Sequence, residues 1–273
     1  MKKFKCITVA LLMLSFTSCG NANTSNKSSD EGVSNKTDEQ SKSLNLTSDP
    51  KADLEKAQKA GNVVFLVITG TGATGLDNII NIANQANKKV KKSVVIQLNK
   101  DDNANSKLVT KYGIAGVAVP FVLVISSKGY AVGGLAAGQA TADALVKLVP
   151  SPKYDEVLVA INSKNPVFVV ASKKTFTDKA AVMANCKAAA KKLANNAPVI
   201  IEVDMSDANE TAFLTQIGVD MSSANTATVV ITSGGNVSGN YIGVTDVQKL
   251  ADAAVKVVKS CCPSGSSSGC GKK

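Results

Sequence analysis

The sequence predicts an α/β protein of two tandem domains, each with a central mixed sheet flanked by helices, between a disordered N-terminal tether and a Cys-rich C-terminal tail. Apolar runs typical of strands alternate with stretches of helical spacing, and the whole pattern occurs twice. Corresponding residues lie 103 to 105 positions apart, which indicates duplication of a whole domain rather than a short solenoid repeat. With 44% apolar residues in 273, the chain has enough material for packed cores.

The chain begins with a predicted export leader, residues 1–18. Three lysines precede an apolar stretch that is too short to span a bilayer. The residues that end at Cys19 resemble the lipobox of bacterial lipoproteins, in which the cysteine is acylated, for example with palmitate, and becomes the first residue. Cys19 is therefore the predicted lipidation site, and an ordinary signal-peptidase cut nearby is the alternative. The resemblance implies an exported protein, anchored to a bacterial cell membrane on its periplasmic or extracellular face.

Residues 19–49 are predicted to form a disordered tether behind this anchor. Between residues 20 and 49 the apolar positions are Ala22, Val33, Leu44 and Leu46, too few to offset the entropy lost on ordering. A flexible chain of about 30 residues has an r.m.s. reach of roughly 30 Å, enough to hold a folded domain clear of lipid headgroups.

The first domain is expected over residues 50–150. Its continuous apolar runs are typical of buried strands, and the four residues between two of them form a hairpin turn. The predicted elements are strand 63–68, a helix over 76–90, strand 94–98, a short helix ending at Gly113, strands 121–125 and 130–132 around a turn at 126–129, and a helix over 141–149.

The second domain, residues 151–259, repeats this order. Phe65 corresponds to Phe168, Asp102 to Asp207 and Gly113 to Gly218. Its predicted elements are strand 167–170, a helix ending at Leu193, strand 199–203, a helix ending at Gly218, strand 228–231, a turn at 234–235 and a closing helix.

Each copy resembles the thioredoxin fold. The first copy has Tyr-Gly-Ile at residues 112–114 and Val-Pro-Phe at 119–121, which is similar to the family's Tyr-Gly-Val and cis-proline signature, and the resemblance covers nearly all of residues 50–258. It implies that Pro120 follows a cis peptide bond and borders the active-site position. The second copy has Thr226 in place of this proline.

The family's Cys-x-x-Cys motif is missing from both copies. Thioredoxin-like oxidoreductases carry it where the helix after the first strand begins, because the helix amino end lowers the pKa of the attacking thiol. That position is occupied by residues 72–76 in the first copy and 173–177 in the second, and neither stretch contains a cysteine. Cys186 lies on the apolar stripe of a helix and is predicted to be a core thiol. No catalytic residue is therefore predicted within either domain.

The loop after the first strand offers an alternative function. Gly70, Gly72 and Gly75 fit the G-x-G-x-x-G pattern of dinucleotide-binding proteins, with Asp101 as a candidate ribose partner. The second copy lacks this glycine loop, and a hairpin replaces the next βα unit. We keep dinucleotide binding as an outsider, and the glycines otherwise form a flexible loop where the redox motif would be.

The composition excludes several chemistries. The chain has no histidine and no arginine, which removes His-assisted nucleophiles, His-ligated metals and bidentate arginine clamps. Its net charge of +10 falls to +7 without residues 1–18. The lysine pairs fall on expected helix faces or turns without interleaved aromatic residues, so no nucleic-acid partner is predicted.

The remaining reactive groups lie in the tail, residues 260–273. Cys261, Cys262 and Cys270 stand in a Gly/Ser-rich segment beside lysines that favour the thiolate. Three interpretations stay open: a disulfide, capture of a soft metal or metalloid such as Cu(I), and a dithiol relay.

The sequence thus predicts a non-enzymatic envelope lipoprotein whose degenerate domains act as a binding or scaffold module. Its expected partners are the membrane, another envelope protein, and a metal ion on the tail thiols. The alternative is a thiol-disulfide oxidoreductase that uses the tail cysteines as a mobile dithiol.

Overall fold

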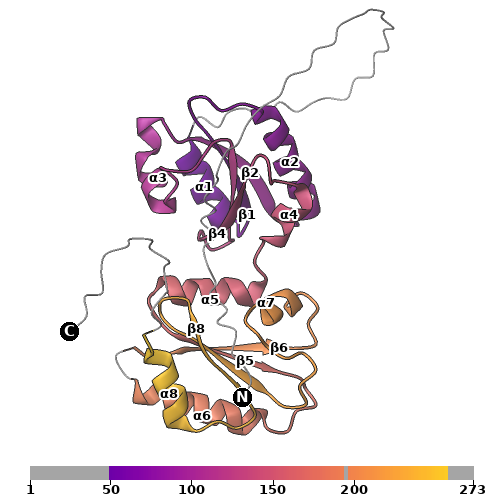
Figure 1. Ribbon diagram of the computed structural model, residues 1–273, viewed down its shortest axis with the longest axis vertical. Coiled ribbons are helices and arrows are strands. Elements are labelled where there is room, and N and C mark those ends of the chain that lie inside the picture. The colour runs from indigo at the N-terminus through magenta and orange to yellow at the C-terminus, as the bar shows by residue number, and fades with distance from the viewer. Residues whose placement is uncertain (1–48, 194–195, 258–273) are drawn as a thin grey trace, which may run out of the picture.

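The computed structural model describes residues 49–193 and 196–257, which form two domains of the same design (Figure 1). Domain 1 contains α1 (Pro50–Lys59), β1 (Val63–Thr69), α2 (Leu76–Lys89), β2 (Ser93–Asn99), the 3₁₀ turn η1 (Asn103–Asn105), α3 (Ser106–Tyr112), β3 (Phe121–Ile125), β4 (Ala131–Ala136) and α4 (Ala142–Lys147). Domain 2 contains α5 (Pro152–Asn162), β5 (Val167–Ser172), α6 (Lys179–Lys192), β6 (Val199–Asp204), α7 (Thr211–Gln216), β7 (Ala227–Ile231), β8 (Val237–Ile242) and α8 (Val247–Val255).

The two sheets have the same topology. The strand orders are β2-β1-β3-β4 and β6-β5-β7-β8. In each sheet the first two strands of the domain pair in parallel, the third strand pairs antiparallel with the first, and the fourth pairs antiparallel with the third. The register pairs Phe65 with Val95 and Phe168 with Ile200, which matches the equivalence expected from the sequence. Both domains therefore have the thioredoxin-like fold, with a mixed sheet between helices.

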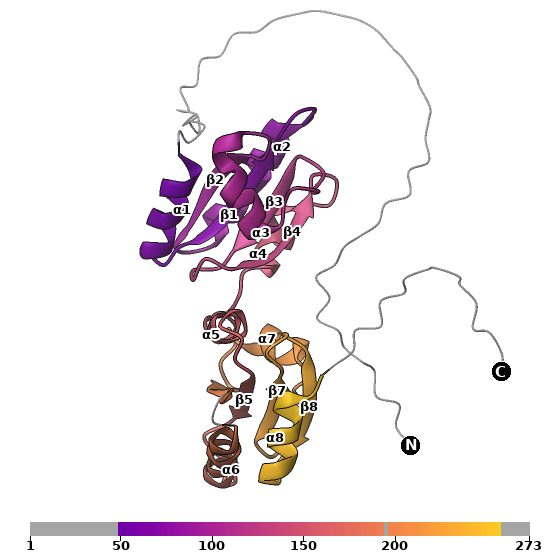
Figure 2. The same cartoon turned by 90° about the vertical axis from the view of Figure 1, so that its left-hand side faces the viewer.

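Each sheet is covered by helices on both faces. In domain 2, α5 and α7 lie on one side of the sheet and α6 and α8 on the other (Figures 1 and 2). The central strand β1 alternates: Phe65 and Val67 join the core beneath α2, and Leu66 and Ile68 join the core beneath α1 and α3. Phe65 and Phe168 are fully buried, and burial of such a ring contributes about 2–3 kcal/mol.

Helices α1 and α5 were absent from the predicted order. Helix α1 buries only Leu54 and Ala57, which is too little periodicity to stand out in the sequence. Local capping starts it instead: the Asp49 carboxylate accepts from the backbone N–H groups of Lys51 and Ala52, and proline follows the cap. Ser151 caps α5 in the same way. A capping residue followed by proline was the signal that could have found both helices.

The loop residues also obey the repeat. Gly113 and Gly218 both have a left-handed φ, of 64° and 83°, where α3 and α7 end. Asp102 and Asp207 each accept a hydrogen bond from a backbone N–H two residues on. The duplication therefore extends from the strands to individual turns.

Candidate functional site

The cysteines singled out in the sequence for lipidation and metal binding, Cys19, Cys261, Cys262 and Cys270, lie outside the described residues. Within residues 49–193 and 196–257, no group of three His, Cys, Asp or Glu side chains could hold a metal ion. Among the helices in those same ranges, none has the length and apolar character needed to cross a membrane. The described site features are therefore the two positions where a Cys-x-x-Cys motif was expected, one buried thiol and two surface hollows.

In domain 1 the dithiol position is a glycine loop tied down by Asp101. The Thr71 N–H donates to Asp101 Oδ2 at 2.6 Å, and this backbone hydrogen bond lowers the pKa of the carboxyl. A Cβ on Gly70 would lie 2.7 Å from the same oxygen, so a side chain at this position would displace the Asp101 carboxylate. Gly72 and Gly75 have left-handed φ values of 77° and 72°. Backbone geometry thus accounts for Gly72 and Gly75, and one Asp101 oxygen is already occupied by the loop itself.

The peptide bond between Val119 and Pro120 is cis, which is the isomer that the family signature implies for this position. Pro120 is buried at the start of β3, and its carbonyl accepts from the Ala137 N–H at 3.2 Å.

In domain 2 the corresponding position is closed by hydrogen bonds between Asp178 and Thr226. The Thr226 hydroxyl donates to Asp178 Oδ1 at 2.7 Å, and the Thr226 N–H lies 3.2 and 3.1 Å from the two carboxylate oxygens. Thr226 is fully buried and stands where the first copy has proline. The start of α6, where a reactive dithiol would lie, is therefore bonded directly to the loop before β7.

Cys186 is a core thiol, as predicted. It is fully buried among residues of α6, α8 and β5, and its Sγ lies 4.0 Å from Thr228 Oγ1. Burial raises the pKa of the thiol, and the contact with Thr228 opposes this only in part. A buried thiol with a raised pKa is a poor nucleophile.

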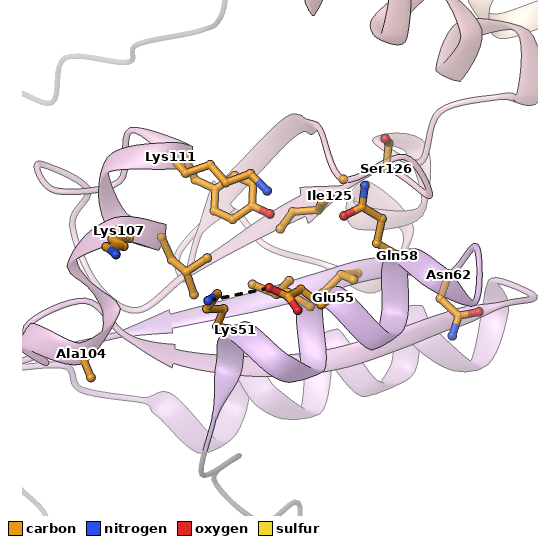
Figure 3. Close-up of a pocket in the computed structure, with 14 residues that line it drawn as sticks. Lys51, Glu55, Gln58, Asn62, Ala104, Lys107, Lys111, Ile125 and Ser126 are labelled. Carbon is orange, nitrogen blue, oxygen red and sulfur yellow. Dashed lines mark ion pairs between the residues drawn. The ribbon is translucent and has the colours of Figure 1, made fainter.

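A groove of about 220 Å³ lies in domain 1 between α1 and α3 (Figure 3), and we call it the α1–α3 groove. One end of the groove is lined by three lysines, Lys51, Lys107 and Lys111. The other end is lined by the uncharged polar residues Gln58, Asn62 and Ser126. Its apolar lining consists of Leu54, Val64, Leu108, Tyr112 and Ile125.

The charges along this groove are predominantly positive. Lys51 forms a long 3.9 Å ion pair with Glu55, and both side chains are largely exposed. Lys111 lies over the Tyr112 ring, with its Nζ 5.0 Å from the ring centroid. The arrangement suits an anionic group beside a small apolar surface. Sequence reasoning missed this groove because α1 itself was not predicted.

A second hollow, of about 390 Å³, lies in domain 2 at the carboxyl ends of β5 and β6. Its charges are compensated within the domain. Lys179 forms a 2.8 Å ion pair with Glu202. Glu210 is buried and accepts from the Ser151 hydroxyl at 2.5 Å and the Lys153 N–H at 3.0 Å. These groups already satisfy one another, which leaves this hollow less suited than the α1–α3 groove to a charged ligand.

Comparison with known proteins found no matching family model and no matching curated protein. Among solved structures, the first two thioredoxin domains of Naumovozyma dairenensis Eps1p are 10% identical over 74% of this chain and 94% of that chain, with a TM-score of 0.30. The zinc-bound form of human ERp44 is 12% identical over 75% and 57%, with a TM-score of 0.32. The NTD_N/C domain of alkylhydroperoxide reductase AhpF from Enterococcus faecalis is 11% identical over 76% and 99%, with a TM-score of 0.23. The assignment of the fold to this chain rests on its own strand order and helix placement.

Proposed function

We propose that this protein is a non-enzymatic binding or scaffold module of the bacterial envelope, built on two thioredoxin-like domains that have lost dithiol chemistry. The observation that carries the proposal is the state of the two former active-site positions. Neither contains a cysteine; Asp101 holds the loop of domain 1, and Asp178 bonds to Thr226 in domain 2. A thioredoxin-like framework without its thiols keeps its surfaces for recognition, because fold alone does not determine activity.

The membrane location is part of the proposal. Acylation of Cys19 would hold the protein at a bilayer surface, since each buried methylene contributes about 0.8 kcal/mol. Cys19→Ser is expected to release the protein from membranes on fractionation, and the matched variant Cys6→Ser within the leader is expected to leave it bound. Membrane retention of Cys19→Ser would contradict the anchor.

A second role is proposed for the tail. Cys261, Cys262 and Cys270 provide three thiolates on a Gly/Ser-rich segment, and with no histidine in the chain a site there would be all sulfur. Thiolate ligands select soft ions such as Cu(I). The reduced protein, handled without oxygen, is expected to bind one Cu(I) per chain and to lose it when all three cysteines become serine. The control variant Cys186→Ala should keep the ion, because that thiol is buried.

The competing oxidoreductase function makes the opposite prediction in a disulfide-reduction assay. If the tail cysteines act as a mobile dithiol, the wild type reduces a disulfide substrate with turnover and the triple serine variant does not. We expect no turnover from either protein. Turnover that requires the tail cysteines, in a protein that binds no Cu(I), would replace our proposal with the oxidoreductase.

A further inference from the structure

We propose that the α1–α3 groove of domain 1 binds an extended acidic peptide segment of a partner protein. The inference deepens the binding role proposed above, because it names the site and the chemical class of the ligand. It rests on a comparison of the two copies, on their charges and on the dimensions of the groove.

The equivalent groove of domain 2 is filled by an aromatic stack. Tyr154 of α5 and Phe213 of α7 have ring centroids 5.2 Å apart and an interplanar angle of 15°. Gly61 and Lys164 both have a left-handed φ and lie 103 positions apart, which aligns α1 with α5 at this offset. Lys51 of α1 is therefore the counterpart of Tyr154. The offset of 105 between Gly113 and Gly218 places Leu108 where Phe213 stands. A lysine and a leucine in domain 1 therefore replace the two rings that close domain 2.

A second link between the helices is also specific to domain 2. Buried Glu210 precedes α7 and accepts hydrogen bonds from Ser151 and Lys153, where α5 begins. At the offset of 105 its counterpart is Asn105, whose amide donates to the Asn99 carbonyl of β2 at 2.9 Å rather than bonding to α1. The groove in domain 1 is open because both connections between its walls have been replaced.

The charges of the two domains point to an anionic ligand. Residues 50–150 contain twelve lysines and six acids, whereas residues 151–257 contain ten of each. Lys107 and Lys111 correspond to Ala212 and Gln216 at the same offset. Four residues apart on α3, they share one face, and neither forms an ion pair with any residue that the structure describes. Domain 1, which has the open groove, thus also carries two lysines without an ion pair among the described residues, at positions where domain 2 has uncharged residues.

The dimensions and lining favour a peptide over a lipid surface. From Lys51 to Asn62 the chain of α1 and its end spans roughly 16 Å at 1.5 Å per residue, which about five residues of extended peptide would match at 3.3 Å each. The Gln58 amide nitrogen donates to the Lys128 carbonyl at 2.9 Å, and its oxygen faces the groove and suits a peptide N–H (Figure 3). Leu108 and Tyr112 suit small apolar side chains. A flat membrane surface would meet the lysines without entering a groove walled by two helices.

The test uses a fluorescein-labelled hexapeptide of alternating glutamate and valine, with fluorescence anisotropy on the full chain. Saturable binding that weakens with salt is expected. Lys107→Gln with Lys111→Gln should reduce affinity about three- to tenfold. The matched pair Lys88→Gln with Lys91→Gln removes the same charge from exposed positions of domain 1 outside the groove and should change affinity less than twofold.

A second variant closes the groove. Lys51→Tyr with Leu108→Phe copies the stack of domain 2 and is expected to abolish binding while circular dichroism shows an intact fold. The inference is overturned if this folded variant binds like the wild type, if the control pair weakens binding as much as the groove pair, or if a lysine-valine hexapeptide binds equally well. Binding to phosphatidylglycerol vesicles through the same lysines, without peptide binding, would also overturn it. The disulfide-reduction assay on the same sample tests the proposed function separately. If the protein neither binds the peptide nor reduces the disulfide substrate, the assignment of the groove is rejected and the proposed non-enzymatic function is not.

Discussion

Replacing Thr226 with valine removes one hydrogen bond from domain 2 and leaves the shape of the side chain nearly unchanged. The lost bond joins the fully buried hydroxyl to Asp178 Oδ1 at 2.7 Å. A hydrogen bond to a charged group contributes about 1.5–3 kcal/mol, so Thr226→Val should lower the free energy of unfolding of domain 2 by about 2 kcal/mol.

Asp178→Ala should cost more than Thr226→Val. It removes the same bond and also leaves the buried Thr226 N–H without its acceptor, which adds about 1–2 kcal/mol for a total of about 3–4 kcal/mol. The double variant should be no less stable than Asp178→Ala alone, because the hydroxyl and its acceptor then disappear together. The coupling energy of the double-mutant cycle is therefore expected to be about 2 kcal/mol.

Cys186 provides the assay for this cycle. It is fully buried in the core of domain 2, so in a urea series a brief pulse of thiol reagent labels it only in molecules with this domain unfolded. Mass spectrometry of the peptide that contains Cys186 separates its labelling from that of the other cysteines. A coupling energy below about 0.5 kcal/mol would refute the role assigned to the Asp178 and Thr226 pair, since that value is within the usual error of additivity.

Three further predictions concern single positions. Gly134→Ala should destabilise domain 1 by about 1–3 kcal/mol in urea unfolding, because a Cβ there would lie 2.6 Å from a backbone oxygen of β3; Gly138→Ala, with open space around it, should be neutral. The Asp101 pKa is lowered by the Thr71 N–H, so the loop contact should persist from neutral pH down to the ordinary carboxyl pKa and be lost as the pH falls through the lowered value. The hydrogen-exchange rate of the Thr71 amide, relative to its intrinsic rate, measures the loss of this hydrogen bond. Asp101→Asn should abolish the pH dependence of that protection. Cys186 in the folded protein should react with iodoacetamide at pH 8 far more slowly than in urea, because burial raises the pKa of its thiol; equal rates would contradict its placement.

The duplicated strands were predictable because their signal is local. Runs such as 63–68 and 94–98 are apolar at nearly every position, as expected of strands with helices on both faces, and the turns around Gly113 and Gly218 require a left-handed backbone. Such features depend on neighbouring residues, so their order and the two-fold repeat could be predicted from the sequence.

The two opening helices show where local reasoning failed. Helix α1 contributes two buried residues to the core and owes its start to the Asp49 cap and Pro50, so it has little apolar periodicity of its own. Most helix stability in proteins comes from tertiary packing, and the packing surface in this case is a sheet built largely from later residues.

By itself the sequence determined the two-domain α/β organisation, the absence of a dithiol from both domains, the core position of Cys186 and the absence of histidine and arginine chemistry. Only the tertiary structure decided how the two positions expected for a Cys-x-x-Cys motif are held by hydrogen bonds, and which domain has the open groove. Asp178 meets Thr226 across 48 residues, and Tyr154 meets Phe213 across 59. Such contacts arise when helices and loops far apart in the chain are brought to one face or one edge of a sheet, and no local pattern specifies which of them will touch.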